Sequence, residues 1–172
     1  WQRGTSFAGV TPYYTADRWM AYREGAVAGS TYTQQTASLN GSLYSLRSQR
    51  DSGNSATNNI YNAYAMETRD SIKLRGNKLT LSFWAKCGAN YSAASSRLVS
   101  AIYTGTGTDE QFTNGFTGSA VVATSNNTLT TSWQKFTVTT TNVLANTVTQ
   151  IAIKFVDTPV GTAGANDWFE IT

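Results

Sequence analysis

Apolar and polar residues alternate along several stretches of the chain, most clearly over residues 78–87. One parity set is apolar and consists of Leu79, Leu81, Phe83, Ala85 and Cys87. The other set consists of Thr80, Ser82, Trp84 and Lys86. Because successive side chains of a β-strand point to opposite faces, this alternation predicts a strand with one buried face.

Two later segments repeat the pattern. Residues 133–141 place Phe136 and Val138 on one side and Lys135 on the other. Residues 149–156 place an apolar set inward, and Gln150 and Lys154 point the opposite way. Further strands are predicted at 18–23, 30–36, 43–48, 59–66, 97–104, 119–123 and 167–171, because β-branched and aromatic residues suit a half-buried pleated surface.

Turn signals rich in Asn and Gly separate these segments, at 40–41, 52–54, 76–77, 88–90, 105–107, 114–115, 126–127 and 161–164. About ten short antiparallel strands at this spacing predict an all-β sandwich. One helical turn is predicted at 67–74, and Gly76 is expected to end it. No composition shift marks a second domain, so residues 1–172 are interpreted as one unit. The chain begins with Trp1 rather than Met, and we expect it to be a piece of a longer protein.

Composition excludes several kinds of chemistry. The chain has no His and one cysteine, Cys87, which excludes histidine-based triads, histidine metal sites and internal disulfides. Hydrophobic residues make up 40% of the chain, which argues against disorder. The net charge of +3 is spread along the sequence, so we expect no nucleic-acid partner. No apolar run approaches the roughly 18 residues of a membrane span, and we expect no membrane insertion.

Enzyme interpretations find little support in the residues. The Gly-rich stretch 105–110 lacks the Gly-Lys-Ser/Thr ending of a phosphate loop and no helical pattern follows it. The ten acidic residues are scattered, and Asp109 and Glu110 would point to opposite faces of a strand. We therefore expect no catalysis and no cofactor. A calcium ion held by Asp157 and Asp167 is left open, because hard carboxylate oxygens suit that ion.

Aromatic residues are the stronger signal, since the chain has 5 Trp, 9 Tyr and 7 Phe. A flat indole or phenol ring can stack on the apolar C–H face of a sugar, while neighbouring polar groups bind its hydroxyls. Strand parity places Trp84 on the polar face of its strand and Tyr103 opposite Ile102. The predicted sugar platforms are Trp84, Tyr61, Tyr64 and Tyr103, and the predicted rim donors are Arg47, Lys86 and Gln150.

Structural alternatives stand beside each of these residues. A loop or a neighbouring subunit can cover an outward Trp84, because large aromatic side chains usually end up mostly buried. For Tyr61, Tyr64 and Tyr103 taken one by one, burial preferences favour packing at the edge of the core over contact with a ligand. If neighbouring subunits bury the outward aromatic residues, these residues serve assembly rather than sugar recognition.

Several segments together resemble a domain of bacteriophage tail-fibre and virion proteins. They are residues 1–7 (WQRGTSF), 14–19 (YTADRW), 66–67, 76–86 (GNKLTLSFWAK), 105–107, 132–137 (SWQKFT) and 168–171 (WFEI). The resemblance spans nearly the whole chain. That domain is similar to carbohydrate-binding modules with the galactose-binding jelly-roll fold, and the resemblance implies glycan binding without locating the site.

The resemblance and the residues together predict a non-catalytic sugar-binding module of a phage virion, associated with the tail. The expected partners are a host surface glycan, other virion proteins and a second and third copy of the chain in a homotrimer. The alternative is a structural module that assembles or decorates a fibre or capsid by binding protein neighbours.

Overall fold

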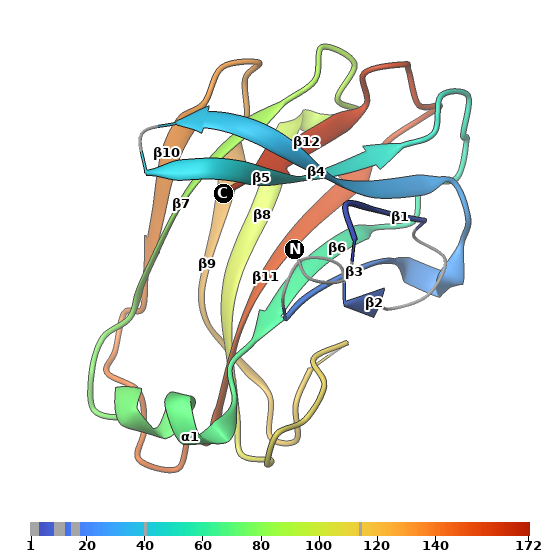
Figure 1. Ribbon diagram of the computed structural model, residues 1–172. Helices are drawn as coiled ribbons and strands as arrows, with labels where there is room; N and C mark the ends of the chain where they lie inside the picture. Colours follow the sequence, from blue (N-terminus) through green and yellow to red (C-terminus); the bar gives the residue numbers. More distant parts are fainter. Residues whose placement is uncertain (1–3, 9–12, 15–17, 40, 114) are drawn as a thin grey trace.

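The alternating segments fold into two antiparallel sheets that pack face to face as a sandwich (Figure 1). The computed structural model describes residues 4–8, 13–14, 18–39, 41–113 and 115–172. Sheet A has the strand order β1-β4-β5-β12-β7-β10 and sheet B the order β2-β3-β6-β11-β8-β9. The predicted all-β antiparallel sandwich is thus confirmed.

Each sheet combines strands from distant parts of the chain. The strands of sheet A are β1 (Ser6–Ala8), β4 (Ser30–Leu39), β5 (Ser42–Arg50), β12 (Trp168–Ile171), β7 (Thr80–Cys87) and β10 (Gln134–Thr139). The strands of sheet B are β2 (Tyr13–Tyr14), β3 (Trp19–Arg23), β6 (Ile60–Ala65), β11 (Gln150–Pro159), β8 (Ala93–Gly105) and β9 (Ala120–Thr128). Two 3₁₀ turns, η1 (Glu24–Ala26) and η2 (Ile72–Leu74), and the short helix α1 (Thr68–Ser71) complete the described chain.

The predicted parity of the strands agrees with their burial. In β7 the side chains of Phe83, Ala85 and Cys87 are buried, while Ser82 and Trp84 are exposed. The ring of Phe83 lies 4.7 Å from that of Phe155 on β11, so the two sheets meet through aromatic contacts. The apolar parity of each sheet therefore forms the core between them.

The local sequence pattern predicted the short helix correctly but predicted one turn wrongly. Residues 68–74, within the predicted turn, form α1 and η2, and Gly76 follows with a φ of 72°, a left-handed conformation that favours glycine. The turn predicted at 126–127 is wrong, because both residues lie inside β9. The buried Asn127 amide donates to the Leu98 carbonyl at 2.9 Å and to Ser100 Oγ at 3.0 Å, so the neighbouring strand satisfies it. The short strands β1 and β2 were not predicted.

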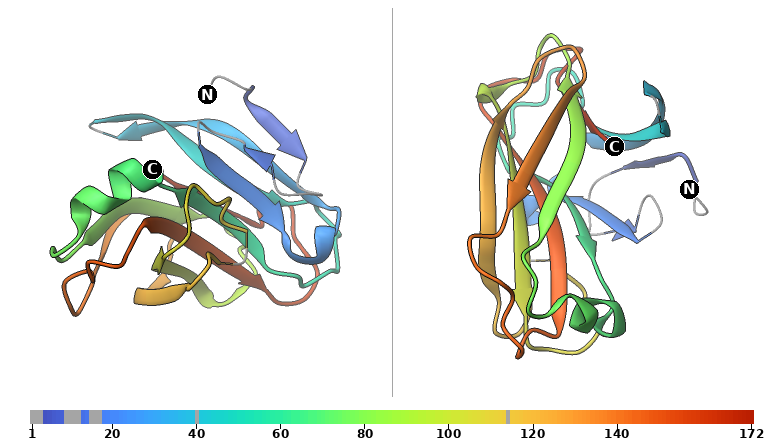
Figure 2. Two further views of the ribbon diagram at one scale, coloured as in Figure 1. Left: turned by 90° about the horizontal axis from the view of Figure 1, so that it is seen from below. Right: turned by 90° about the vertical axis from the view of Figure 1, so that its left-hand side faces the viewer.

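A segment that leaves β8 covers the outward face of sheet B. Phe112 and Phe116, in the connection between β8 and β9, are buried against Ala63 of β6 and Ala152 of β11. In the left view of Figure 2 this connection, drawn in yellow, runs in front of those strands. We call residues 106–113 and 115–119 the covering segment. The side of sheet A that faces away from the core has no such cover among the described residues.

No helix in the described part of the chain is long and apolar enough to cross a membrane.

Candidate functional site

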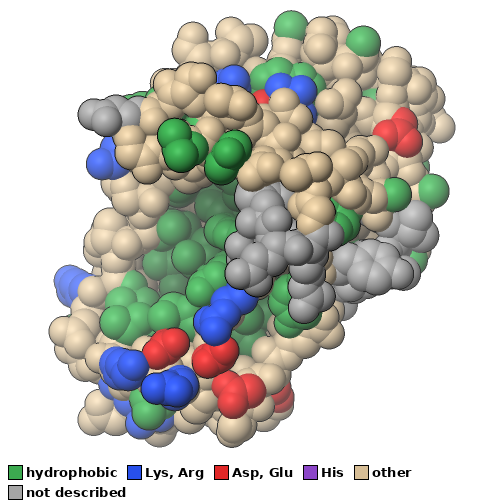
Figure 3. Space-filling model, in the orientation of Figure 1, with side chains coloured by type: hydrophobic (Ala, Val, Ile, Leu, Met, Phe, Trp, Pro, Cys, Tyr) green, Lys and Arg blue, Asp and Glu red, His purple; other side chains and the backbone are tan. Residues whose placement is uncertain are grey.

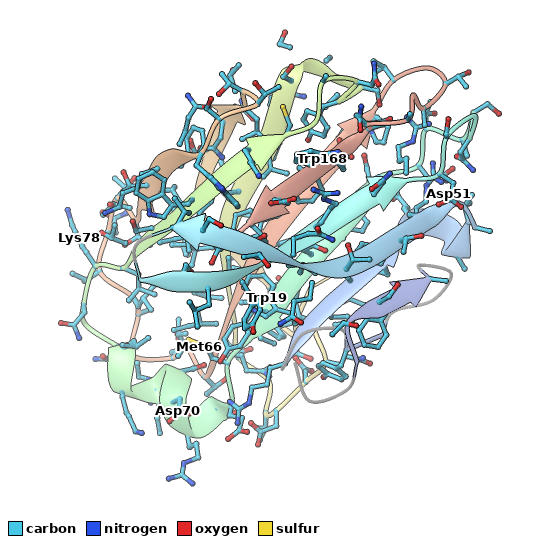
Figure 4. All side chains as sticks on the ribbon, turned by 45° about the horizontal axis from the view of Figure 1, so that its top comes forward. Trp19, Asp51, Met66, Asp70, Lys78 and Trp168 are labelled. Atoms are coloured by element: carbon cyan, nitrogen blue, oxygen red, sulfur yellow. The ribbon has the colours of Figure 1, made fainter. Side chains whose placement is uncertain are left out.

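Three tryptophans gather on the outward face of sheet A. Trp84 lies on β7, Trp168 begins β12, and Trp133 immediately precedes β10. The register pairs Trp84 with Lys135 of β10, and Lys86 with Glu170 of β12. Trp84 is 37% exposed and the other two indoles are half-buried. Figure 4 shows Trp168 on sheet A, well separated from Trp19. We call this surface the tryptophan face.

A row of charged residues crosses the same face. Glu170 is almost fully buried, and its Oε1 accepts hydrogen bonds from Arg47 Nε at 2.8 Å and Arg47 Nη2 at 2.6 Å. Its Oε2 accepts a bond from Ser45 Oγ at 3.1 Å and lies 3.4 Å from Lys86 Nζ. Arg47 and Lys86 are thus held on either side of one carboxylate, which fixes their orientation.

The two cations also hold the indoles. The Arg47 guanidinium lies 4.2 Å from the centre of the Trp168 ring. Lys86 Nζ lies 4.8 Å from the Trp133 ring and 5.7 Å from the Trp168 ring. These are cation–π distances, and they restrict the rotation of both indoles.

A glycine permits the position of Trp168. A Cβ atom on Gly88, just after β7, would lie 2.7 Å from Trp168 Nε1 and 2.1 Å from the Asn166 carbonyl oxygen. Any larger residue at position 88 would displace the start of β12 together with the indole of Trp168. The tryptophan face is therefore built by a specific close approach of two strands as well as by the residues that point outward.

This arrangement has the features of a sugar-binding surface. Flat indoles offer stacking area, and the remaining N–H donors of Arg47 and Lys86 stand beside them. Of the seven residues predicted to bind sugar, the structure brings three together here: Trp84, Lys86 and Arg47. Trp133 and Trp168 were missed, although the outward parity of Lys135 also implies an outward Trp133.

Two predicted platforms lie on the opposite sheet and are covered. Tyr61 is 7% exposed and its ring lies 4.9 Å from that of Tyr22 and 3.8 Å from Lys154 Nζ. Tyr103 is half-buried, and the covering segment places the Phe112 ring 4.9 Å from it. Burial lowers the pKa of Lys154, which forms no ion pair within the described residues. Neither tyrosine presents an open ring face, so this part of the prediction is corrected.

Gln150 is fully buried and holds the start of the covering segment. In the amide orientation that satisfies both atoms, its nitrogen donates to Glu110 Oε2 at 2.8 Å and its oxygen accepts from the Asp109 amide at 3.1 Å. A side chain enclosed in this way has no surface to offer a ligand. The predicted role of Gln150 as a rim donor is therefore replaced by a structural one.

Tyr64 is half-buried and does not line the apolar cleft between the sheets. Its ring lies 5.6 Å from that of Trp19, which lines this cavity of about 270 Å³. The cavity is lined chiefly by Trp19, Tyr44, Leu46, Phe83, Ile153 and Phe155. Figure 3 shows it as a hollow lined with hydrophobic side chains. At its mouth the tip of the β4–β5 hairpin exposes Leu43 and Tyr44, which are 77% and 54% accessible.

A polar hollow of about 230 Å³ beside α1 brings acidic residues near one another. Each of them already has a partner: Glu67 pairs with Arg18 at 2.6 Å, and Asp109 accepts from the Thr68 amide at 2.7 Å. Glu110 accepts two bonds from Thr117, which lower its pKa. A general acid needs a raised pKa, so Glu110 is unsuited to act as the proton donor of glycoside hydrolysis.

Asp167, one of the two acids considered for calcium, already forms an ion pair. Asp167 Oδ2 lies 2.8 Å from the fully buried Arg50, whose guanidinium also donates to three backbone carbonyls, those of Asn54, Ala56 and Gly161. Arg50 thus occupies the oxygen-lined space beside Asp167. Within the described residues no cluster of three or more His, Cys, Asp or Glu side chains could hold a metal ion.

No protein-family model matches the sequence, and no curated protein matches it.

Solved structures share the fold at low sequence identity. A carbohydrate-binding module from the β-sandwich superfamily, in a structure described for promiscuous specificity, has a TM-score of 0.61 and 13% identity over 95% of this chain and 60% of its own. A putative sugar-binding protein from Bacteroides thetaiotaomicron has a TM-score of 0.58 and 13% identity over 99% of this chain and 93% of its own.

A phage protein is also among the structural neighbours. The enzymatically active domain of tailspike protein 4 from bacteriophage CBA120 has a TM-score of 0.56 and 11% identity. The match covers 90% of this chain and 18% of the tailspike chain. The structural neighbours are thus mostly carbohydrate-binding modules with β-sandwich folds, together with a phage tailspike domain, and they establish the fold of this chain.

Proposed function

We propose that this chain is a non-catalytic carbohydrate-binding module that binds glycans on its tryptophan face. The observation that carries the proposal is the grouping of Trp84, Trp133 and Trp168 around Lys86 on one uncovered face. Isolated exposed aromatics are ordinary, whereas here two indoles held by shared cations lie beside a third, exposed indole and form a pre-organised surface. The carbohydrate-binding modules among the structural neighbours support the same function.

The binding mechanism follows from the chemistry of the face. Sugar rings stack their C–H faces on the indoles, above all on the exposed Trp84. Arg47 and Lys86 donate hydrogen bonds to ring hydroxyls with the N–H groups that Glu170 does not use. Each site of this kind is expected to bind weakly, and several copies in one assembly raise the overall affinity through avidity.

We place this module in a phage virion, associated with the tail, where it recognises host surface glycans. The residues that resemble phage tail-fibre domains support this placement, and the tailspike neighbour is consistent with it. Other virion proteins and two further copies of the chain are the proposed neighbours. A trimer would present three tryptophan faces to one cell surface.

A glycan array tests the proposal, with intrinsic tryptophan fluorescence measured in parallel on the best glycan. We expect saturable binding that changes the fluorescence, and we expect Trp84→Ala to weaken it by at least about tenfold. Tyr44→Ala is the matched control, because it removes an exposed aromatic ring from the apolar cleft instead. Circular dichroism verifies that both variants are folded.

The two variants separate the two candidate surfaces. If Tyr44→Ala abolished binding and Trp84→Ala did not, the sugar site would be the cleft and the tryptophan face would be rejected. Folded protein without any glycan bound would reject sugar recognition altogether.

A second function, assembly by contact with protein neighbours, is favoured by the apolar cleft. Its floor of aromatic and aliphatic side chains and the exposed Leu43 at its mouth suit a protein side chain better than a hydroxyl-rich sugar. Sedimentation tests it: concentration-dependent oligomers that Tyr44→Ala dissociates, with no bound glycan, would favour assembly. A monomer at all concentrations would argue against it.

A further inference from the structure

The tryptophan face carries an excess of positive charge. Arg47, Lys86 and Lys135 all point outward on it, and the acid among them is Glu170. Glu170 is 1% exposed and lies below the cations that it pairs with. The side chains of Arg47 and Lys86 remain 24% and 22% exposed. A ligand above this face therefore meets the cations before the carboxylate.

Lys135 adds to the excess of positive charge beside Trp84, the most exposed of the three indoles. It lies directly across from Trp84 in the β10–β7 register and its side chain is exposed. Within the described residues it forms neither an ion pair nor a hydrogen bond. Neighbouring strands lie about 4.8 Å apart, and alternate residues of one strand about 7 Å apart. Lys135 and Lys86 therefore flank Trp84 on two sides.

The other acidic side chains near sheet A are remote from Trp84. Asp51 follows the far end of β5, beyond Gln49, and accepts a bond from Thr31 Oγ1 at 3.4 Å. Figure 4 shows Asp51 at the opposite end of the sheet from β10. Glu67 and Asp70 belong to the region of α1, where Arg18 and Lys73 pair with them. No acidic side chain among the described residues forms an ion pair with Lys135.

We propose that the tryptophan face selects acidic glycans, whose sugar rings carry carboxylate groups. A ring stacked on Trp84 presents its substituents toward Lys135 on one side and Lys86 on the other. A carboxylate in either position gains a charge-assisted hydrogen bond, while a neutral sugar offers only hydroxyl acceptors, which form weaker bonds. This inference rests on the proposed sugar-binding function and adds the class of sugar.

The test compares matched glycans. An array holding uronic-acid and sialic-acid glycans beside their neutral counterparts is screened at low salt. The best acidic glycan is then titrated together with its carboxyl-reduced form, which has the same skeleton without the charge. We expect the acidic form to bind about three- to tenfold more tightly. Salt at 1 M, where the Debye length is about 3 Å, should remove most of the difference.

Substitutions test whether Lys135 causes the preference for the acidic glycan. Lys135→Gln should weaken the acidic glycan by about threefold and leave the reduced form unchanged. Lys73→Gln is the matched control, because it removes an exposed lysine near α1, at the other end of the molecule. Equal effects of both substitutions would show a general charge effect and would overturn the assignment to Lys135.

The outcomes distinguish the inference from the function on which it rests. Neutral hits alone, or equal affinity for the acidic and reduced forms, would overturn the acidic preference and leave sugar binding intact. Folded protein that binds neither class would overturn both.

Discussion

The outward faces of the two sheets start from similar residues and end in different environments. Each carries aromatic rings beside an outward lysine: Lys86 among tryptophans on sheet A, and Lys154 beside Tyr61 on sheet B. On sheet A the lysine lies 3.4 Å from a carboxylate and keeps contact with solvent. On sheet B the covering segment encloses the lysine, which is 7% exposed. The covering segment, which connects β8 to β9, causes this difference in exposure between the two lysines.

The comparison shows that outward parity is not the same as accessibility. A strand determines which side of its sheet a residue occupies, because side chains alternate. Whether that side meets water depends on what packs over it. Phe112 and Phe116 turn the outward face of sheet B into a second, smaller core. The tryptophan face is open because nothing among the described residues fills the same role there.

Truncating Phe112 of the covering segment should have the largest effect on the stability of the protein. Phe112 is fully buried and contacts the rings of Tyr103 and Phe116 at 4.9 and 4.8 Å. Phe112→Ala is expected to lower the free energy of unfolding by about 3–5 kcal/mol, the usual cost of such a cavity. Urea unfolding measures it.

Trp133→Ala is the control for this experiment, because it truncates a half-buried ring on the uncovered face. It should cost no more than about 1 kcal/mol. A larger loss from Trp133→Ala than from Phe112→Ala would contradict the comparison.

The two sheets also differ in how they hold a buried carboxylate. Glu170 of sheet A accepts several hydrogen bonds, whereas Asp157 Oδ1 of sheet B has no partner among the described residues. Burial and the nearby Asp167 carboxylate raise the pKa of Asp157 to about 7. In the unfolded chain the same group titrates near pH ~3.9.

The sign of the resulting pH dependence is fixed by that raised pKa. Between pH ~4 and about 7 the unfolded chain releases a proton that the folded chain retains. This stabilisation is therefore full below pH ~4 and is lost as the pH rises through about 7. The loss amounts to about 4 kcal/mol at most, since one pKa unit corresponds to about 1.4 kcal/mol.

Asp157→Asn isolates this contribution, because the amide is neutral at every pH. Urea unfolding at pH 5 and pH 8 should show the parent losing more stability than the variant. Parallel pH profiles of parent and variant would reject a protonated Asp157.

Substituting the two outward lysines, Lys86 and Lys154, should change the stability by a smaller amount and compares the two faces directly. Lys154→Met removes a buried charge without an ion pair, and should be neutral or stabilising by up to about 1 kcal/mol. Lys86→Met removes one of the two cations paired with the buried Glu170, and should cost about 1 kcal/mol. Thermal and urea unfolding at pH 7 measure both. A greater loss from Lys154→Met would show that its contacts with Tyr61 and Phe112 outweigh its burial.

Fluorescence quenching is expected to show the smallest difference. The cations around Trp84 should attract iodide and repel caesium, so at low ionic strength iodide should quench about twofold more efficiently. Lys135→Gln should reduce this preference, and Lys73→Gln should leave it unchanged. Equal quenching by both ions would contradict the charge imbalance of the tryptophan face.

Much of the fold could be predicted because its signal is local. Alternation in β7, β10 and β11 identified the buried faces, and Gly76 identified the end of the helical turn. The error at residues 126–127 arose because two asparagines favour a turn in isolation, while Asn127 in β9 is satisfied by atoms of β8. The short strands β1 and β2 carry too few residues for a periodic signal.

The candidate site was predictable only in part. Trp84 and Lys86 share a parity two residues apart, so their common face follows from one strand. Arg47 and Trp168 come from β5 and β12, and their place beside Lys86 follows from the order of strands in sheet A. Gln150 has an outward parity in the sequence, yet the covering segment encloses it.

The sequence by itself therefore determined the class of fold, the buried parity of each long strand and the absence of histidine chemistry. The tertiary structure alone decided which strands are neighbours and which outward face is covered. The alternation of apolar and polar residues relates neighbours in the sequence, so it can be recognised from the sequence alone. Strand order and cover depend on contacts between residues more than a hundred positions apart, such as Arg47 and Glu170, and no local pattern specifies these contacts.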